Sequence, residues 1–137
     1  MNNEIDYTKL GSTMTEIDVI GACLLDTDVF NYVRDMLARE LFQDYDCLCV
    51  YDVMQQVADE GKIPDWQEMD ARLRQKNVDI KRFITGTTAS FEVTKQRIEL
   101  LQDLSIRRRI VALAYKEQVM MTDPTITVEE VRTVLKQ

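Results

Sequence analysis

Residues 94–121 read TKQRIELLQDLSIRRRIVALAYKEQVMM and contain neither glycine nor proline, so nothing in this segment interrupts a helix. Its apolar residues fall on two lines at three- and four-residue spacing. One line holds Leu101, Leu104, Val111, Tyr115 and Val119, and the other holds Ile106, Ile110, Leu113 and Met120. A surface helix needs only one apolar stripe to face its own core. The second stripe therefore indicates either a central helix wrapped by its own domain or a contact with another molecule.

The composition is that of a single globular helical domain. Of the 137 residues, 45% are hydrophobic and 30% are charged, which allows an ordinary core without disulfides or metals. The two prolines and four glycines are too few for a turn-rich all-β fold. Long windows at helical spacing dominate, so the sequence predicts an all-α fold, with a small helical bundle followed by a long helix.

The net charge of −7 is unevenly distributed. Residues 1–60 carry 13 acidic against 3 basic residues, a balance of −10, whereas residues 61–137 carry 11 against 14, a balance of +3. An acidic chain repels a phosphate backbone, so we expect no strong direct binding of nucleic acid.

The cysteines and the N-terminal segment favour a cytoplasmic protein. No signal-peptide pattern is present, and the longest apolar run near the N-terminus is too short to span a bilayer. The chain has an odd number of cysteines, Cys23, Cys47 and Cys49, and none of them has the spacing of a redox motif. We therefore expect them to be reduced and to serve as buried small hydrophobes.

Helices are expected at about residues 16–25, 29–39, 44–60, from 66 onward, 79–84, 94–121, and from 128 to the end of the sequence. Thr15, Asp65 and Thr127 each open a capping-box pattern, and Gly61 stands where a C-cap glycine belongs. Residues 1–14 are expected to form a flexible tail, residues 86–90 a connector, and residues 15–121 one helical domain. Residues 122–137 begin a last helix with Val131 and Leu135 among its apolar positions, and its short length indicates continuation in a longer protein.

The residues expected of a catalytic or metal site are missing from this sequence. It contains no histidine and no phosphate-cradling loop, so no catalytic, cofactor or metal residues are assigned. The paired acids lie at expected helix starts, where they cap free amides. Arg107, Arg108 and Arg109 are the only basic run. They point about 100° apart on a helix, so Arg108 is interpreted as flanking the apolar stripes rather than as binding phosphate.

Several segments, taken in order, resemble the N-terminal domain of DnaB-type bacterial replicative helicases. The opening helix carries Glu16, the run VIGACLLD at residues 19–26, and Phe30. The later matches are Phe42, then Gly61 with Pro64 and Asp65, then Met69 and Leu73, and finally the run LLQDLSIRRRIV at residues 100–111. The resemblance covers roughly residues 15–121.

The resemblance implies a role in DNA replication but no catalysis by this chain. In that family the domain is a helical bundle plus a helical hairpin; hairpins pair between subunits, and three pairs form a collar on the hexameric ring. The collar docks primase, and a helicase loader is a further expected partner. ATP and Mg²⁺ belong to a RecA-like motor domain that this sequence does not contain. The expected interaction residues are Leu101, Leu104, Arg108, Val111, Leu113, Tyr115, Val119, Met120, Val131 and Leu135.

Two other hypotheses remain open from the sequence. One is the helicase-binding C-terminal domain of primase, whose fold is related; the position of the motif close to Met1 favours the helicase. The other is a free-standing helical adaptor or regulator unrelated to replication. A Walker-type motif further along the open reading frame would support the helicase, and its absence would support the adaptor.

Overall fold

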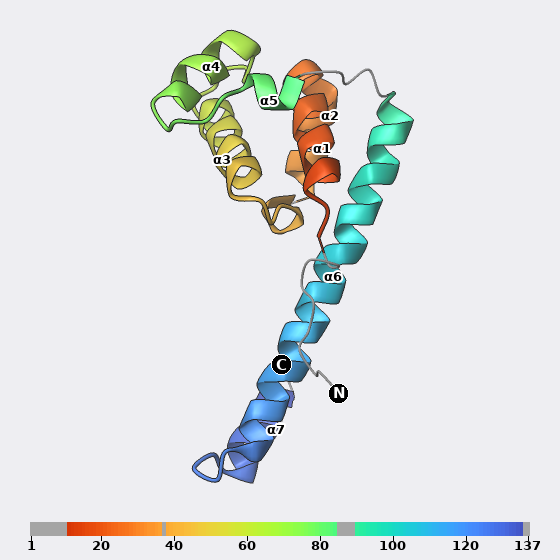
Figure 1. Cartoon of the computed structure of the whole chain (residues 1–137), viewed down its shortest axis with the longest axis vertical. Coiled ribbons are helices and arrows are strands. Elements are labelled where there is room, and N and C mark those ends of the chain that lie inside the picture. Colours follow the sequence, from red (N-terminus) through yellow and green to blue (C-terminus); the bar gives the residue numbers. More distant parts are fainter. Residues whose placement is uncertain (1–10, 37, 85–89, 136–137) are drawn as a thin grey trace. The chain divides into compact units, whose positions relative to one another are not determined.

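The structure is a computed structural model that describes residues 11–36, 38–84 and 90–135, and within these ranges it is helical and has no strands (Figure 1). The elements in order are α1 (Thr13–Leu25), α2 (Thr27–Asp35), the 3₁₀ segment η2 (Ala38–Leu41), α3 (Tyr45–Asp59), α4 (Trp66–Arg74), α5 (Lys81–Ile84), α6 (Phe91–Thr122) and α7 (Val128–Leu135). The predicted all-α fold with a long helix is confirmed. Residues 1–10 of the expected tail and residues 86–89 of the expected connector lie outside the described residues.

The chain divides into two compact units, residues 1–105 and residues 106–137, and the division falls inside the uninterrupted helix α6. In the first unit, α1 packs against α2, α3 and α5, while α3 also packs against α4 (Figure 1). The core draws side chains from every helix of this unit and from the loop before α5. The largest of them are Ile20, Phe30, Met54, Met69, Leu73, Ile80, Phe83, Ile98 and Leu101.

Short polar side chains fix where the helices of the first unit begin. Asp26, Asp44 and Asp65 cap α2, α3 and α4, each accepting a backbone N–H at 2.9–3.1 Å. The expectation for the start of α1 was wrong: its N-cap is Ser12, whose Oγ accepts the Thr15 N–H at 3.3 Å, so the helix begins at Thr13. Two hydroxyl residues three apart offer two possible caps, and the earlier one adds almost a turn of helix.

Gly61 ends α3 as predicted. Its φ of 77° is the left-handed conformation that glycine adopts without a steric penalty. The Gly61 N–H donates to the Ala58 carbonyl at 3.0 Å, and the Lys62 N–H donates to the Val57 carbonyl at 3.2 Å, which satisfies carbonyls at the helix end. Helix α2 is shorter than expected, because the Met36 N–H closes a tight turn onto the Val33 carbonyl at 3.2 Å. Leu37, expected to point inward, lies outside the described residues.

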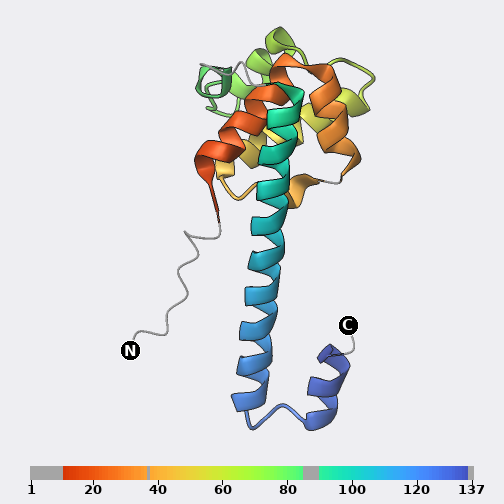
Figure 2. The same cartoon turned by 90° about the vertical axis from the view of Figure 1, so that its right-hand side faces the viewer.

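The second unit contains the end of α6, a turn and α7. The turn is closed by Asp123, whose carboxylate accepts the Thr125 N–H at 2.9 Å and the Thr125 hydroxyl at 2.7 Å. Thr127 caps α7 as predicted, since its hydroxyl accepts the Glu130 N–H at 3.2 Å. In Figure 2, α7 turns back from the end of α6, which is the start of the expected hairpin. Within the described ranges, no helix is long and apolar enough to cross a membrane.

Candidate interaction surfaces

The first part of α6 belongs to the core of the first unit. Its inward side is formed by Thr94, Ile98, Leu101 and Ser105, all buried. The beginning of α6 is also attached to α2, because the rings of Phe91 and Tyr32 meet edge to face with centroids 5.6 Å apart. The spacing of these buried residues is that of one helix face, so this part of α6 has an ordinary amphipathic character.

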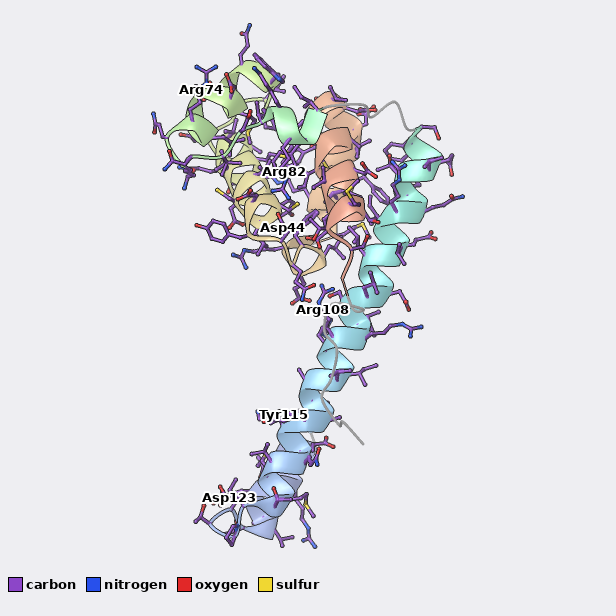
Figure 3. All side chains as sticks on the ribbon, in the orientation of Figure 1. Asp44, Arg74, Arg82, Arg108, Tyr115 and Asp123 are labelled. Carbon is purple, nitrogen blue, oxygen red and sulfur yellow. The ribbon has the colours of Figure 1, made fainter. Side chains whose placement is uncertain are left out.

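Beyond residue 105, α6 exposes apolar side chains instead of burying them. The exposed fractions are 52% for Ile106, 61% for Ile110, 50% for Leu113, 59% for Tyr115, 44% for Val119 and 69% for Met121. Figure 3 shows the side chains that stand out from this segment, with Arg108 and Tyr115 labelled. Val128, the first residue of α7, is 70% exposed. The second unit therefore presents large apolar side chains that the described residues do not cover.

The two predicted stripes lie on nearly opposite sides of this part of α6. Successive helical residues are rotated by about 100°, so Val111 on the first stripe and Leu113 on the second point about 160° apart. Both stripes are at least partly exposed: Val111 is half-buried, and Tyr115 and Leu113 are exposed. One neighbouring helix can cover only one of two opposite faces.

The predicted interaction residues are distributed over both units. Leu101 is 1% exposed and lies in the core of the first unit, and Leu104 packs partly against that core. Arg108, Val111 and Met120 are half-buried, whereas Leu113, Tyr115 and Val119 are exposed. Val131 and Leu135 belong to α7, but their side chains lie outside what the structure describes. Among the predicted residues whose side chains the structure describes, the accessible ones thus lie on the segment of α6 in the second unit.

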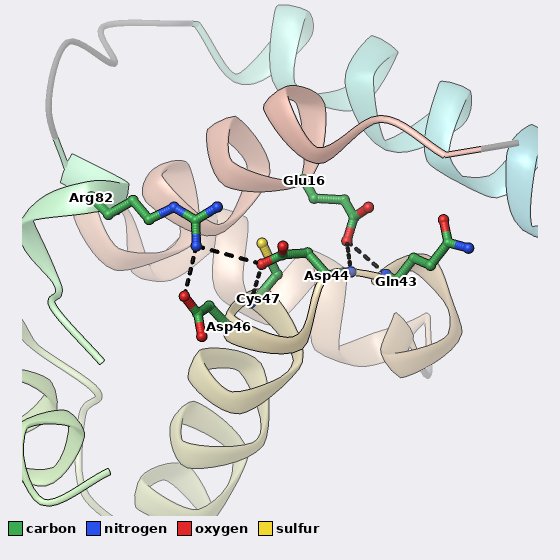
Figure 4. A network of polar contacts seen from close by, with 6 residues as sticks. All are labelled: Glu16, Gln43, Asp44, Asp46, Cys47 and Arg82. Atoms are coloured by element: carbon green, nitrogen blue, oxygen red, sulfur yellow. Dashed lines mark hydrogen bonds and ion pairs between the residues drawn. The ribbon is translucent and has the colours of Figure 1, made fainter. Parts of the chain in front are cut away.

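A buried carboxylate at the start of α1 is a feature that the helical pattern did not predict (Figure 4). Glu16 is 1% exposed, and its Oε1 accepts the backbone N–H groups of Gln43 at 2.6 Å and Asp44 at 3.0 Å. These are the last N–H groups before α3, so Glu16 fastens the beginning of α3 to α1. The motif that resembles the helicase family contains this acid, but the helical pattern alone does not reveal its partners.

The beginning of α3 is held from α5 as well. The Arg82 Nη1 atom lies 2.7 Å from an Asp46 carboxylate oxygen and 3.7 Å from one of Asp44 (Figure 4). The Asp44 carboxylate also accepts the Cys47 N–H at 3.1 Å. Three elements distant in sequence therefore meet at one helix start, and every group in this cluster has a structural partner.

The cysteines behave as packing residues. Cys23 and Cys47 are buried, and Cys49 is partly buried. Burial, with a smaller contribution from Asp26, raises the pKa of Cys23 to about 12. Burial is also the main cause of the raised pKa of Cys47, followed by Asp44 and Glu16. A thiol that stays protonated is a poor nucleophile. Among the described residues, no group of three or more His, Cys, Asp or Glu side chains is placed to hold a metal ion.

Comparison with known proteins identifies the family of the chain but no individual relative. No curated protein and no solved structure matches the sequence significantly. The model of the DnaB-like helicase N-terminal domain matches residues 9–100, which include α1 to α5 and residues 91–100 of α6. The match covers well over half of the chain and agrees with the all-helical structure. The chain therefore belongs to the family of DnaB-like helicase N-terminal domains.

Proposed function

We propose that this chain is the oligomerisation and partner-docking domain of a hexameric replicative DNA helicase. The membership in the family supports the setting in DNA replication. The observation that carries the oligomerisation role is the pair of exposed apolar stripes on the second part of α6. In this proposal the hairpin of α6 and α7 pairs with the hairpin of a second copy, and pairs of copies assemble into the collar of the ring.

Burial of the exposed side chains of one stripe would favour such pairing. Complete burial of a large aliphatic side chain contributes about 1.5–3 kcal/mol relative to leaving it in water. Ile106, Ile110 and Leu113 of one stripe are each roughly half exposed, so burying the remainder contributes about half of that amount per side chain. Two-fold symmetry doubles every contact, and closed two-fold pairing is the commonest way to cover a surface of this kind. Association costs reduce the total, so we expect a dimer that depends on concentration.

Docking of primase, and of a helicase loader, is the second part of the proposal. In this arrangement the domain positions partners at the collar, while the motor domain that binds ATP and Mg²⁺ lies elsewhere in the protein. A titration with the primase encoded by the same genome tests this part. A saturable complex with this chain supports it, and the absence of binding at about 100 µM, a weak-interaction limit, contradicts it.

The pairing of hairpins is tested by placing a charge on each stripe in turn. Val111→Asp and Leu113→Asp alter opposite sides of α6, and Ala114→Asp adds the same charge at an exposed position between the two stripes. The variant on the pairing stripe should give a folded monomer in sedimentation velocity experiments. The variant on the other stripe should remain dimeric, with a lowered melting temperature if that stripe packs within the hairpin.

Two results would refute the hairpin dimer. One is a parent chain that is monomeric at every accessible concentration. The other is a dimer that withstands both Val111→Asp and Leu113→Asp. If Ala114→Asp also dissociated the dimer, the effect would come from charge alone and not from the stripes.

A further inference from the structure

The first part of α6 is held against the first unit differently from the helices that build its core. Among the described helices, the closest packing is that of α1 with α2, α3 and α5, and of α3 with α4, and α6 belongs to none of these pairs. Although α6 is the longest helix described, it supplies only two buried apolar side chains to the core, those of Ile98 and Leu101, whereas α3 supplies six. A helix with few closely packed side chains gains less from van der Waals contact. We call residues 91–105 of α6 the docked segment.

The docked segment also brings polar groups into its contact with the other helices. Thr94 and Ser105 are buried, and they stand on either side of Ile98 and Leu101 along the helix. The Thr94 hydroxyl donates to the Ser90 carbonyl at 3.0 Å, so this hydrogen bond lies at the start of α6 itself and does not join α6 to another helix. A contact of this mixed polar and apolar character resembles the interfaces between parts of a protein that move against each other.

The side chain of Arg97 is imperfectly accommodated when α6 is docked. Its Nη1 atom is buried and has no hydrogen-bond partner among the described residues. Its Nη2 atom lies 4.0 Å from the carboxylate of Asp18 on α1, which is too far for a hydrogen bond. A donor that leaves bulk water without gaining a protein partner destabilises the state that buries it. The docked state therefore carries a cost that is removed when Arg97 returns to water.

The remaining attachments of the docked segment join it to α2 at the surface. The rings of Phe91 and Tyr32 meet edge to face, and the Lys95 Nζ atom lies 4.7 Å from the centroid of the first ring and 5.6 Å from that of the second. The same Nζ atom lies 3.7 Å from the carboxylate of Glu92. Cation–π contacts and ion pairs at exposed positions each contribute little to stability. These attachments can break without any change in the core formed by α1 to α5.

We propose that the docked segment is a releasable contact, so that α6 leaves the first unit as one body while α1 to α5 stay folded. Release uncovers Ile98 and Leu101 and returns Arg97 to water, and it leaves the closely packed helix pairs intact. The released state is the minor one, because burial of the two aliphatic side chains still favours docking. The inference does not depend on hairpin pairing. If copies do pair through their hairpins, release lets each group of helices α1 to α5 turn while the paired hairpins stay in place.

Thiol labelling of the full chain tests this release, because a buried thiol reacts only when it becomes exposed. Thr94→Cys and Ser105→Cys each replace a buried hydroxyl by a thiol, at opposite ends of the docked segment. Cys23 on α1 and Cys47 on α3 are buried and serve as internal controls for the unfolding of the core. Circular dichroism first establishes that each variant keeps the helix content of the parent chain, and peptide mass spectrometry then assigns each label to its thiol.

Both introduced thiols should react with N-ethylmaleimide about 100-fold faster than Cys23 and Cys47, because a local opening needs less free energy than global unfolding. The two introduced thiols should react at similar rates, since one movement exposes both. Urea well below the unfolding transition should raise these two rates only slightly, because release exposes little surface, whereas the rates of Cys23 and Cys47 should rise steeply.

Arg97→Met tests the cause of the release. Methionine keeps a long apolar stem and removes the unpaired N–H group, so it should favour docking and slow the labelling of both introduced thiols about tenfold. Arg109→Met is the matched control, because it makes the same change at an exposed position of α6 outside the docked segment, and it should leave both rates unchanged.

Hydrogen exchange of the parent chain gives a second measurement that needs no substitution. The backbone amides of residues 95–105 should exchange faster than those of α1 and α3, because a released helix has lost the packing that stabilises it. Equal protection of all three helices would contradict release.

Three labelling results would also overturn the inference. If the introduced thiols react no faster than Cys23 and Cys47, α6 leaves only when the whole unit unfolds. If Thr94→Cys reacts fast and Ser105→Cys reacts slowly, α6 frays at its start and is not released as one body. If Arg97→Met speeds the labelling, Arg97 holds α6 in place, and the imperfect contact from which release was inferred does not exist. None of these results bears on hairpin pairing, which the stripe variants test separately.

Discussion

Replacement of Glu16 should strongly destabilise the first unit, because its one carboxylate accepts two backbone hydrogen bonds. Glu16→Ala removes the acceptor for two backbone N–H groups, those of Gln43 and Asp44, at the start of α3. A hydrogen bond to a charged group contributes about 1.5–3 kcal/mol, so the pair contributes about 3–6 kcal/mol. Water can reach the exposed Gln43 and replace part of this loss. We therefore expect Glu16→Ala to lower the free energy of unfolding by about 3 kcal/mol, out of the roughly 5–15 kcal/mol typical of a domain.

The assay is urea unfolding followed by far-UV circular dichroism, with two comparison variants. Glu16→Gln keeps the shape and an acceptor oxygen but removes the charge. It should lower the free energy of unfolding by about 1 kcal/mol, because hydrogen bonds to a neutral acceptor contribute less than those to a charged one. Asp18→Ala, two residues along α1, removes a partly exposed acid that lies 4.0 Å from Arg97 and should cost less than about 1 kcal/mol. If Glu16→Ala costs no more than Asp18→Ala, or if the Gln and Ala variants are equally unstable, the two hydrogen bonds do not hold α3 as argued.

Two further predictions concern cysteine ionisation and nucleotide chemistry. Because the pKa of Cys23 is about 12 in the folded chain and 9.0 for a free thiol, the unfolded chain loses this proton first. The contribution of the Cys23 thiol to the free energy of unfolding is complete below the pKa of a free thiol, and it declines as the pH rises from there towards the pKa in the folded chain. In urea titrations between about pH 8 and about pH 10, Cys23→Ala should therefore lose less stability than the parent chain. The chain alone should show neither DNA-stimulated ATP hydrolysis nor tight DNA binding at physiological salt; a purified sample free of helicase that does either would contradict the sequence argument.

The sequence predicted the helices well because their signals are local. The apolar spacing of residues 94–121, the cap at Asp65 and the glycine at residue 61 each depend on neighbours within about one turn, and the structure confirms all three. The error at the start of α1 is also local, since Ser12 and Thr15 are both capable of capping and only one is used.

The contacts of Glu16 could not be predicted in the same way. Its partners lie 27 and 28 residues along the chain and are backbone groups, which leave no pattern in the sequence. The periodicity of α6 likewise showed that two stripes exist but not which one meets another molecule. Leu101 and Val111 share a stripe, yet the first is buried in the core and the second is not.

Ser105 is the last residue of α6 that is buried in the first unit, and the match to the family model ends at residue 100. Substitutions beyond residue 105 therefore alter the surface of α6 rather than the packing of the first unit, and the stability of that unit places little restraint on them. Residues 106–122 can consequently diverge quickly and follow changes in whichever molecule they contact. A lineage could acquire a new binding specificity through this segment while inheriting the bundle nearly unchanged.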